Sequence, residues 1–420
     1  MITPTTVIIT LVLSVGIMVI PRKYFLLPFI VAACFIPGSG RVIVASLDFT
    51  VLRICVLFGV LRLLVRGEVI RIHWNRFDKL FVIWLILGAI IYVFRWGSLS
   101  VLIYKLGVLF DGLGLYWIFR QNIRSWQCIG LSVKLFAVFA IISVLFVISE
   151  RITHINLFSF LGTVGTGVHR GRYRCYGAFG SSIILGLFWA SLIPWFLAYI
   201  KAKSDIILNV TAVISSLICV ILSGSSTPFI TVGAILFFFA LYRYRAYGRQ
   251  IALGFCFLLF ALHVVMEAPV WHLISRVSIF SGSTGWHRYY LIDQAIEHFD
   301  EWMLLGTHDI ERWGWGLRDL ANQYLFEGVC GGGVTLLVFI ILLIYAVKIT
   351  GTFSLHGDND KYKWLSWGIC VSILGHCVSF LAITYFTQIK MVLYLTFAIV
   401  GFIAGNPRTF LTGTNLLSKR

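Results

Sequence analysis

Charged side chains are scarce in this sequence. Asp, Glu, Lys and Arg make up 12% of its 420 residues, whereas 59% of the residues are hydrophobic. Soluble domains carry roughly 25% charged residues. At about half that share the surface cannot be hydrated on all sides, so we expect most of it to face lipid. The scarcity of charge therefore argues against an ordinary water-soluble domain.

The sequence also lacks the common catalytic and metal-binding motifs. It contains no HExxH, GxSxG or CxxC, and its histidines are dispersed without the spacing of metal ligands. Most of the nine Cys residues fall within apolar stretches, where they are typical small packing residues. The glycine-rich run at 162–167 is not a GxGxxG motif and follows no predicted strand. We therefore expect neither a metal nor a cofactor.

Long apolar stretches are what the sequence does contain. A helix needs about 20 apolar residues to cross a bilayer. By this rule we predict an all-α polytopic membrane protein with about 12–13 transmembrane helices, forming a single transmembrane domain over residues 1–420. The candidate spans lie near residues 5–20, 24–37, 47–65, 79–95, 100–119, 129–149, 180–200, 206–222, 229–242, 251–267, 330–348, 364–382 and 389–405. The first has no small-residue cleavage site after it, so it predicts a membrane span rather than a signal peptide.

Basic residues outnumber acidic ones by 34 to 17, which gives a formal net charge of +17. In a soluble protein this excess would favour nucleic acid as a partner, but in a membrane protein Lys and Arg gather in cytoplasmic loops. We expect the second explanation and no nucleic-acid partner. With the spans above, the basic segments fall on one side, which we assign to the cytoplasm: Arg22-Lys23, Arg62–Lys79, Arg120–Arg124, Lys201–Lys203, Arg243–Arg249, Lys361–Lys363 and the tail from Arg408.

Two loops on the predicted outer side carry polar side chains. The shorter one, residues 150–178, is the Arg-rich loop and holds Arg151, Arg170, Arg172 and Arg174. Guanidinium groups bind phosphate oxygens bidentately and keep their charge, so such a cluster suits a pyrophosphate. The alternative is nonspecific contact with lipid headgroups. We favour a specific site for Arg172 and Arg174.

The second loop, residues 267–329, is the long loop and holds nine of the seventeen acidic residues and five of the fourteen Trp. Its apolar positions predict an amphipathic helix over residues 287–305, lying on the outer membrane face. Ser283 or Thr284 can cap this helix. Arg288 then lies in the first turn, where backbone N–H groups favour an anion, with His287 beside it. We predict one phosphate site from Arg174 and Arg288; the alternative is an Arg that snorkels to the interface.

Candidates for catalysis follow this helix. Trp313 and Trp315 alternate with glycines between residues 306 and 316, which suggests aromatic surfaces on which sugar rings stack. Asp319 precedes a predicted helix and is the best-placed carboxylate for a general base. His308 and Glu327 are its rivals, and a structural hydrogen-bonding role is the alternative for each of the three.

Within the predicted spans, charged residues are functional candidates by default. Arg53 and Asp111 lie in different spans, and we predict that they form a structural ion pair between two helices. A transport role for the charges within the spans stays open.

Three short motifs resemble one family of bacterial membrane glycosyltransferases, the O-antigen ligase and Wzy-type O-antigen polymerase superfamily. Arg174-Cys-Tyr-Gly177-Ala-Phe179 resembles its R-x-x-G-x-F pattern. Thr284–Arg288, followed by Leu304-Leu305-Gly306, resembles its [S/T]-G-R segment and the hydrophobic-Gly step downstream. Asn322-Gln-Tyr-Leu325 with the glycines at 328 and 331–333 is similar to its HN-x-Y-L…G-x-x-G ending. The resemblance covers roughly residues 100–350.

The resemblance implies a glycan carried on undecaprenyl pyrophosphate, transferred to an acceptor glycan or lipid on the outer face of the bacterial inner membrane without metal or nucleotide. Arg174 and Arg288 would hold the pyrophosphate, and Asn322 would contact the glycan. Membrane lipids and other polysaccharide-assembly proteins are the further partners that it implies.

One position departs from the family pattern. Ala321 stands where ligases carry a His thought to activate the acceptor, and Asp319 could substitute for it. This favours a polymerase, with an O-antigen ligase proper as the alternative. The hypotheses outside enzymes are a transporter of lipid-linked oligosaccharide or polysaccharide, and a structural subunit of an envelope assembly. A transporter would favour pseudo-symmetric halves, which the long loop interrupts.

Overall fold

The chain folds almost entirely into helices. Its structure, a computed structural model, describes residues 4–44, 47–162, 167–169, 171–276, 285–314, 317 and 319–405. Helix makes up 79% of it, which confirms the all-α prediction. The longer helices are α1 (Pro4–Val19), α2 (Leu27–Phe35), α3 (Val51–Val65), α4 (Arg76–Trp96), α5 (Leu99–Asn122), α6 (Trp126–Thr153), α7 (Ser182–Lys201), α8 (Ile206–Leu222), α9 (Ser226–Ala240), α10 (Gly248–Val265), α12 (Gly285–Glu297), α14 (Gln323–His356), α15 (Asp360–Phe380) and α16 (Gln388–Ala404).

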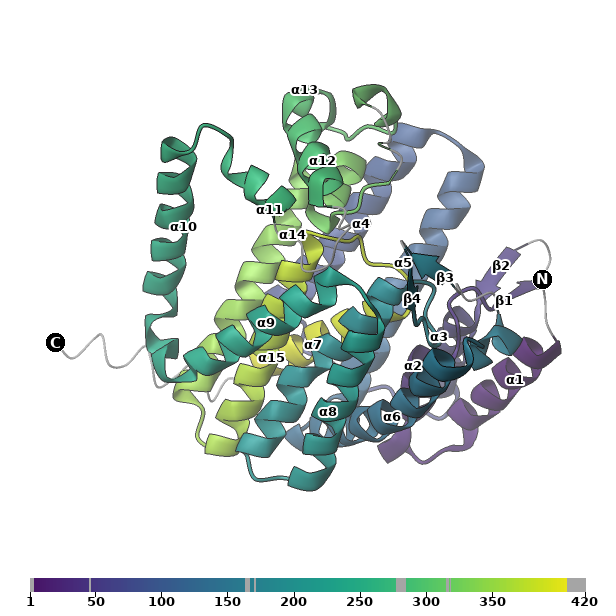
Figure 1. Cartoon of the computed structure of the whole chain (residues 1–420). Helices are drawn as coiled ribbons and strands as arrows, with labels where there is room; N and C mark the ends of the chain where they lie inside the picture. Colours follow the sequence, from purple (N-terminus) through teal and green to yellow (C-terminus); the bar gives the residue numbers. More distant parts are fainter. Residues whose placement is uncertain are drawn as a thin grey trace.

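Short elements connect these helices. They are the helical turns η1 (Arg22–Tyr24), η2 (Leu157–Leu161), η3 (Leu241–Tyr247), η4 (Val270–His272), α11 (Leu273–Arg276), α13 (Phe299–Trp302) and η5 (Glu311–Trp313), and the strands β1 (Arg41–Val44), β2 (Leu47–Thr50), β3 (Gly167–His169) and β4 (Arg172–Arg174). The strands form two antiparallel hairpins, β1–β2 and β3–β4. Figure 1 shows α12 and α13 covering one end of the bundle, which we call the loop end, while α10 stands apart at its edge.

Every apolar stretch expected to form a span contains a helix. Within the described residues, six helical stretches are long and apolar enough to cross a membrane, namely α4, α5, α6, α7, α14 and the continuous run from α9 through η3 to α10. Two stretches are shorter than expected. Helix α2 has nine residues, about 13 Å of helix, which is less than half a bilayer core. The stretch 47–65 begins as strand β2, paired with β1, and becomes helical only at Val51.

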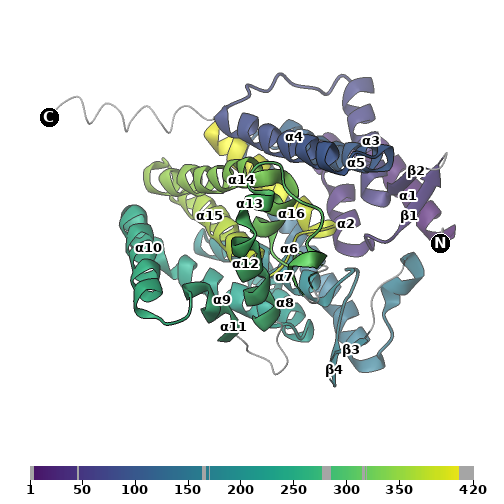
Figure 2. The ribbon, with the colours of Figure 1, turned by 90° about the horizontal axis from the view of Figure 1, so that it is seen from above.

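Helices α7 and α16 lie inside the bundle, as the view from above in Figure 2 shows. Almost every side chain of α7 is buried, including Trp189 and Phe188, because its sequence is apolar on all sides. Gly186 lets a neighbour approach closely, since a Cβ there would lie 2.6 Å from Pro228 Cγ in α9. This close packing fixes where α9 begins.

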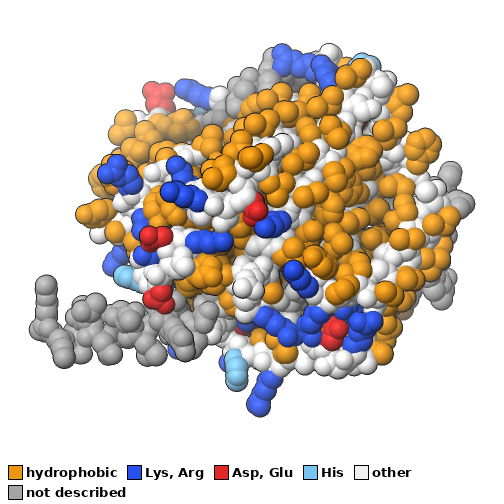
Figure 3. Space-filling view, turned by 90° about the horizontal axis from the view of Figure 1, so that it is seen from below, with side chains coloured by type: hydrophobic (Ala, Val, Ile, Leu, Met, Phe, Trp, Pro, Cys, Tyr) orange, Lys and Arg blue, Asp and Glu red, His pale blue; other side chains and the backbone are white. Residues whose placement is uncertain are grey.

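Large apolar side chains are exposed over much of the surface. Leu11, Phe94, Phe257 and Leu337 are each more than half exposed. The view from below in Figure 3 shows broad apolar areas interrupted by basic side chains, which outnumber acidic ones on this face. Helix α10 has no buried residue. A surface of this kind gains free energy when lipid rather than water covers it.

The predicted ion pair between Arg53 of α3 and Asp111 of α5 is confirmed. Arg53 Nε donates to Asp111 Oδ1 at 2.9 Å, and its Nη2 donates to Oδ2 at 2.7 Å. Such a two-pronged contact satisfies both carboxylate oxygens. The pair therefore ties two helices together, and Asp111 is neutralised.

A buried ion pair joins α4 to α5 at the end remote from the loop end. Asp78 is fully buried and accepts hydrogen bonds from Arg120 Nε at 2.8 Å and from Tyr116 Oη at 2.5 Å. It also completes the capping box of α4, because its Oδ2 accepts the N–H of the N-cap residue Asn75 at 2.9 Å. Gly401 of α16 packs directly on this group, and a Cβ there would lie 2.7 Å from Asp78 Oδ1.

We expect Asp78→Ala to lower the free energy of unfolding by about 3–5 kcal/mol, because it leaves Arg120 buried without its counter-ion. Thermal unfolding of the detergent-solubilised protein measures the loss. Asp360→Ala is the matched control, since Asp360 forms an exposed pair with Lys363 that is worth about 0–1 kcal/mol. Equal melting temperatures for the two variants would contradict this account of Asp78.

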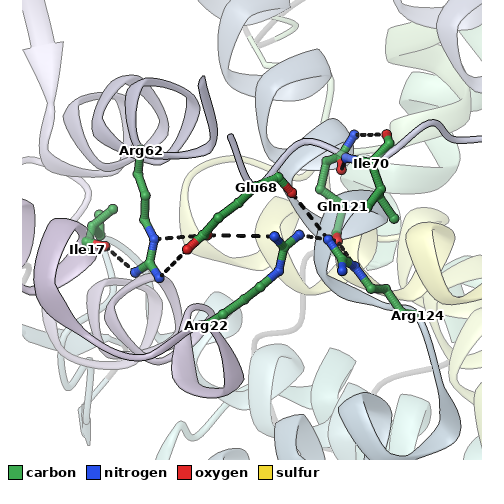
Figure 4. Close-up of polar contacts among 7 residues, drawn as sticks. All are labelled: Ile17, Arg22, Arg62, Glu68, Ile70, Gln121 and Arg124. Atoms are coloured by element: carbon green, nitrogen blue, oxygen red, sulfur yellow. Dashed lines mark hydrogen bonds and ion pairs between the residues drawn. The ribbon is translucent and has the colours of Figure 1, made fainter. Parts of the chain in front are cut away.

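A second polar cluster fastens α1, α3 and α5 to the connection before α4 (Figure 4). Arg62 is fully buried, and its Nε and Nη2 donate to the Glu68 carboxylate at 3.2 and 3.3 Å. Its Nη1 donates to the Ile17 carbonyl oxygen at 2.5 Å. The Gln121 side chain bonds both backbone groups of Ile70, at 2.9 and 3.0 Å. These bonds pair the Arg62 guanidinium within the protein. Part of the charge of this basic segment therefore stabilises the fold.

The long loop forms two helices where the sequence predicted one. Helix α12 ends at Glu297, and α13 begins at Phe299 after His298 leaves helical geometry. Of the apolar positions of the predicted helix, Leu291, Ala295 and Trp302 are buried, whereas Ile296 and Phe299 are about half exposed; Arg288 is buried as well. Whether Ser283 or Thr284 caps α12 lies outside the described residues.

Glycines in α14 allow the segment that follows α13 to pack closely against this helix. Gly333 N–H donates to the Met303 carbonyl oxygen at 2.7 Å, and Thr307 N–H donates to the Val329 carbonyl oxygen at 2.6 Å. Gly332 has φ +75°, and a Cβ there would collide with the Leu304 carbonyl oxygen. The backbones can touch here only because side chains are absent.

We expect Gly332→Ala to lower the free energy of unfolding by at least about 2 kcal/mol, because it adds left-handed strain to the collision. The melting temperature of the purified protein measures this effect. Gly351→Ala in the same helix is the control, since nothing lies within 4 Å of its Cβ position. An equally stable Gly332→Ala variant would rule out tight docking at this point.

Candidate functional site

Four of the predicted site residues line one pocket at the loop end. The pocket has a volume of about 660 Å³ and is lined by His287, Arg288, His308 and Asp319. These residues come from α12, from the segment after α13 and from the segment before α14. Its opposite wall is formed by the start of α7 and by the connector between α15 and α16 (residues 381–387), which we call the connector.

Arg288 is the buried cation of this pocket. It lies on the same face of α12 as Leu291 and Ala295, and its side chain is 8% exposed. Its Nη2 donates to Thr227 Oγ1 at 3.1 Å, while its Nε is buried without a hydrogen-bond partner among the described residues. Burial lowers the pKa of this guanidinium, but Arg remains charged at neutral pH. A buried cation in this state is stabilised by an anionic ligand.

The contact with Thr227 brings Arg288 to the first turn of α9. Ser225 is the N-cap of this helix, and its side chain makes no capping hydrogen bond. The preceding Gly224 has φ +59°, and a Cβ there would lie 3.1 Å from Arg174 Cγ. Arg174 therefore lies against Gly224, and Arg288 contacts Thr227, three residues later in the same turn. The helix dipole makes such a turn a favourable place for an anion.

This turn was not predicted from the sequence. A signal for it exists in Gly224-Ser-Ser-Thr-Pro228, which separates two apolar stretches on the predicted outer side. Ser at the N-cap and Pro within the first helical turn are typical of a helix start. The sequence around each arginine gives no sign that the arginine contacts this turn.

Buried hydrogen bonds fix the part of the Arg-rich loop that directly follows Arg174. The Glu150 carboxylate is 1% exposed and accepts the N–H groups of Tyr176 and Gly177 at 2.9 and 2.8 Å. The Cys175 N–H donates to the Leu222 carbonyl oxygen at 3.1 Å, at the end of α8. Burial raises the pKa of the Cys175 thiol to about 12, so it stays protonated and is a poor nucleophile.

Arg172 lies in a different hollow. With Arg151 it lines an open pocket of about 1010 Å³ beneath the β3–β4 hairpin. Its side chain is exposed, and Arg151 Nη1 donates to the Tyr173 carbonyl oxygen at 3.2 Å. Arg172 therefore does not share the pocket of Arg288, in contrast to the single cluster that the sequence predicted. Arg170 lies outside the described residues.

Both predicted general bases are accessible from the pocket. Asp319 and His308 are exposed, and the His308 ring lies 5.4 Å from the Trp96 ring at the end of α4. The segment that carries Asp319 is held by the connector, since Thr384 Oγ1 donates to the Leu320 carbonyl oxygen. Ala321 lines the same pocket, so a His at this position would also face it.

Glu327, the third candidate base, lies elsewhere. It is buried, and it accepts hydrogen bonds from Trp84 Nε1 at 2.9 Å and from Gln323 Nε2 at 2.6 Å. It lines a small separate cavity together with Lys105 and Lys390. Its carboxylate is thus held by neutral donors, away from the pocket of Arg288.

Two residues expected to contact glycan are buried instead. Trp313 is 4% exposed, its Nε1 donates to Glu301 Oε2 at 2.8 Å, and its ring stacks on His298. It therefore belongs to a small core under the long loop and presents no free face to a sugar. Asn322 is 3% exposed and caps α14 by accepting the Leu325 N–H at 3.1 Å. The remaining candidate, Trp315, lies outside the described residues.

Metal chemistry has no preformed site in the part of the chain that the structure describes, where no three or more His, Cys, Asp or Glu residues form a candidate metal cluster. The pocket offers a buried guanidinium and three exposed groups able to accept a proton, His308, Glu311 and Asp319, while the first turn of α9 contacts the guanidinium through Thr227 without lining the pocket. Compared with known proteins, the chain matches no family model, no curated protein and no solved structure.

Proposed function

We propose that this chain is a membrane glycosyltransferase that polymerises or transfers a glycan from undecaprenyl pyrophosphate on the outer face of the bacterial inner membrane. The observation that carries the proposal is Arg288, a buried cation without a carboxylate partner among the described residues, beside the uncapped start of α9. Asp319 and His308 line the same pocket. A cation that binds the pyrophosphate and a proton acceptor, side by side, are what the transfer of a sugar from a pyrophosphate requires.

The apolar helices support placing the chain across a membrane. Six helical stretches satisfy the length and composition of a span, and many of their apolar side chains are exposed. The basic segments between the helices support an orientation with the loop end on the outer side. In that orientation the pocket opens where lipid-linked glycans meet their acceptors.

The reaction that we propose is a direct displacement at the sugar. A hydroxyl oxygen of the acceptor forms a bond to the anomeric carbon of the donor, and the bond from that carbon to the pyrophosphate oxygen breaks. Asp319 accepts the hydroxyl proton, and the pyrophosphate leaves with the electron pair. Arg288 and Arg174, together with the N–H groups of α9, stabilise the negative charge that develops on the leaving group. The products are the extended glycan and undecaprenyl pyrophosphate.

Polymerisation rather than ligation is the form that we favour. Ala321 lines the pocket where a ligase would present its His, and Asp319, two residues earlier, is a proton acceptor that lines the same pocket. An O-antigen ligase proper is the alternative. A transporter without chemistry is the alternative outside enzymes, and the observation in its favour is the interior cavity that Glu327 shares with Lys105 and Lys390.

Deletion of the gene tests the proposal, with the surface glycan and the lipid-linked pool analysed side by side. Loss of a polymerase leaves single repeat units on the final acceptor, and loss of a ligase leaves long chains on the lipid carrier. Repeat units trapped on the cytoplasmic side would instead identify a transporter and contradict the proposal. Re-expression of the wild-type chain controls for effects on neighbouring genes.

A further inference from the structure

A second polar hollow lies beside the pocket of Arg288. It has a volume of about 320 Å³ and is enclosed by α2, α3, α5 and the start of α16. Polar side chains in its wall include Tyr104, Asp111, Thr387, Gln388 and Lys390. The reaction described above uses none of them.

Several polar atoms in this wall lack a partner among the described residues. Gln388 is 3% exposed, and its Nε2 donates to the carbonyl oxygens of Ile36 at 3.0 Å and Ala178 at 2.7 Å, while its Oε1 accepts no hydrogen bond. Thr387 Oγ1 is also buried without a partner. No hydrogen bond or ion pair of the Lys390 ammonium is found among the described residues, although Glu327 and Asp111 act on it electrostatically. Since unpaired buried polar groups are costly, such a wall suggests a ligand.

The unpartnered atoms restrict the chemistry of that ligand. The Lys390 ammonium donates only, the Gln388 Oε1 accepts only, and the Thr387 hydroxyl does both. The one carboxylate of the wall, Asp111, is already neutralised by Arg53 at 2.7 Å, so a cation gains little there. A ligand with several hydroxyl groups satisfies all three atoms. The aromatic ring of Tyr394, also in the wall, suits the apolar face of a sugar ring.

The hollow and the pocket of Arg288 meet at one residue. Phe386, in the connector, lines both of them and is 38% exposed. A glycan that occupied both cavities would pass over this ring. The Gln388 bond to Ala178 also joins the hollow to the end of the Arg-rich loop.

We propose that this hollow is a second saccharide-binding site, which holds a sugar unit of the acceptor glycan behind the unit that reacts. The assignment to the acceptor rests on the proposed function, because the donor pyrophosphate is placed at Arg288. Lys390 and Gln388 bind hydroxyl groups of that unit, and Phe386 guides the chain toward Asp319.

Binding measurements with two probes test this site. One probe is the oligosaccharide released by mild acid from the surface polysaccharide of the source organism, and the other is undecaprenyl pyrophosphate without sugar. We expect Lys390→Met to weaken oligosaccharide binding about tenfold, the loss of one charged hydrogen bond, and to leave binding of the lipid unchanged. Lys134→Met is the control, since Lys134 pairs with Asp205 at 2.9 Å on the surface.

The outcomes separate this site from the function. Wild-type oligosaccharide binding by a Lys390→Met variant with an unchanged melting temperature would overturn the second site but not the transferase. So would an acyl lipid that occupies the hollow and is displaced by no saccharide. Failure of the wild-type protein to bind undecaprenyl pyrophosphate would overturn the proposed function instead. Phe386→Ala, an exposed position, is the second variant, and we expect it to weaken oligosaccharide binding as well.

Discussion

Arg288→Ala should reduce glycan transfer by about 1000-fold while the protein still folds and inserts. The variant removes a fixed cation from the place where charge develops on the leaving pyrophosphate, and loss of one such donor costs about 10²–10³ in rate. Transfer from the lipid-linked donor, measured with purified protein in detergent, gives the rate. The reduction should appear in both kcat and kcat/KM, because the interaction strengthens in the transition state.

Two comparisons make the Arg288 result specific. Arg288→Lys keeps the charge but loses the planar fork, so its rate should lie between those of the wild type and the Ala variant. Arg312→Ala is the control on the same loop, because Arg312 forms a half-exposed ion pair with Glu301. If Arg288→Ala, correctly inserted, retained the full rate of transfer, the pyrophosphate site would be wrong.

Asp319→Asn should lower kcat by about 10²–10⁴, the usual contribution of a general base, with little change in binding of the lipid-linked donor. The side chain is exposed in the pocket and loses only its ability to accept a proton, so we expect the melting temperature to stay the same. Single-turnover measurements separate this step from binding and release.

His308→Gln is the matched variant for Asp319→Asn, because His308 lines the same pocket and is equally exposed. We expect it to retain most of the activity. A large loss with His308→Gln and none with Asp319→Asn would transfer the role of base to His308. Loss with neither would exclude both Asp319 and His308 as the general base.

The positions of the helices could be read from the sequence, because each needs only a sufficiently long apolar run. The prediction was poorest where non-local packing decides the outcome. Residues 47–50 form a strand because β1 lies beside them, and the long loop breaks at His298, where its two helices pack separately. Neither partner is visible in the local periodicity.

In the site, too, local sequence predicted some features, whereas others depend on non-local packing. Arg288 and Asp319 were chosen for their charge and position, and they do line one pocket. Trp313 was chosen for its ring, but whether a ring is buried depends on neighbours such as His298, far from it in sequence. The turn before α9 was missed because Gly224 and Thr227 acquire their contacts with the two arginines only through tertiary packing.

The close backbone contact at the glycines of α14 also determines which segments can unfold locally together. The Val329 and Met303 carbonyl groups accept hydrogen bonds across the contact at 2.6 and 2.7 Å, so the first turns of α14 and the segment after α13 cannot separate without breaking both. Segments coupled in this way open together. Their amide hydrogens should exchange with solvent deuterium as one cooperative unit, distinct from the rest of α14 beyond Gly333.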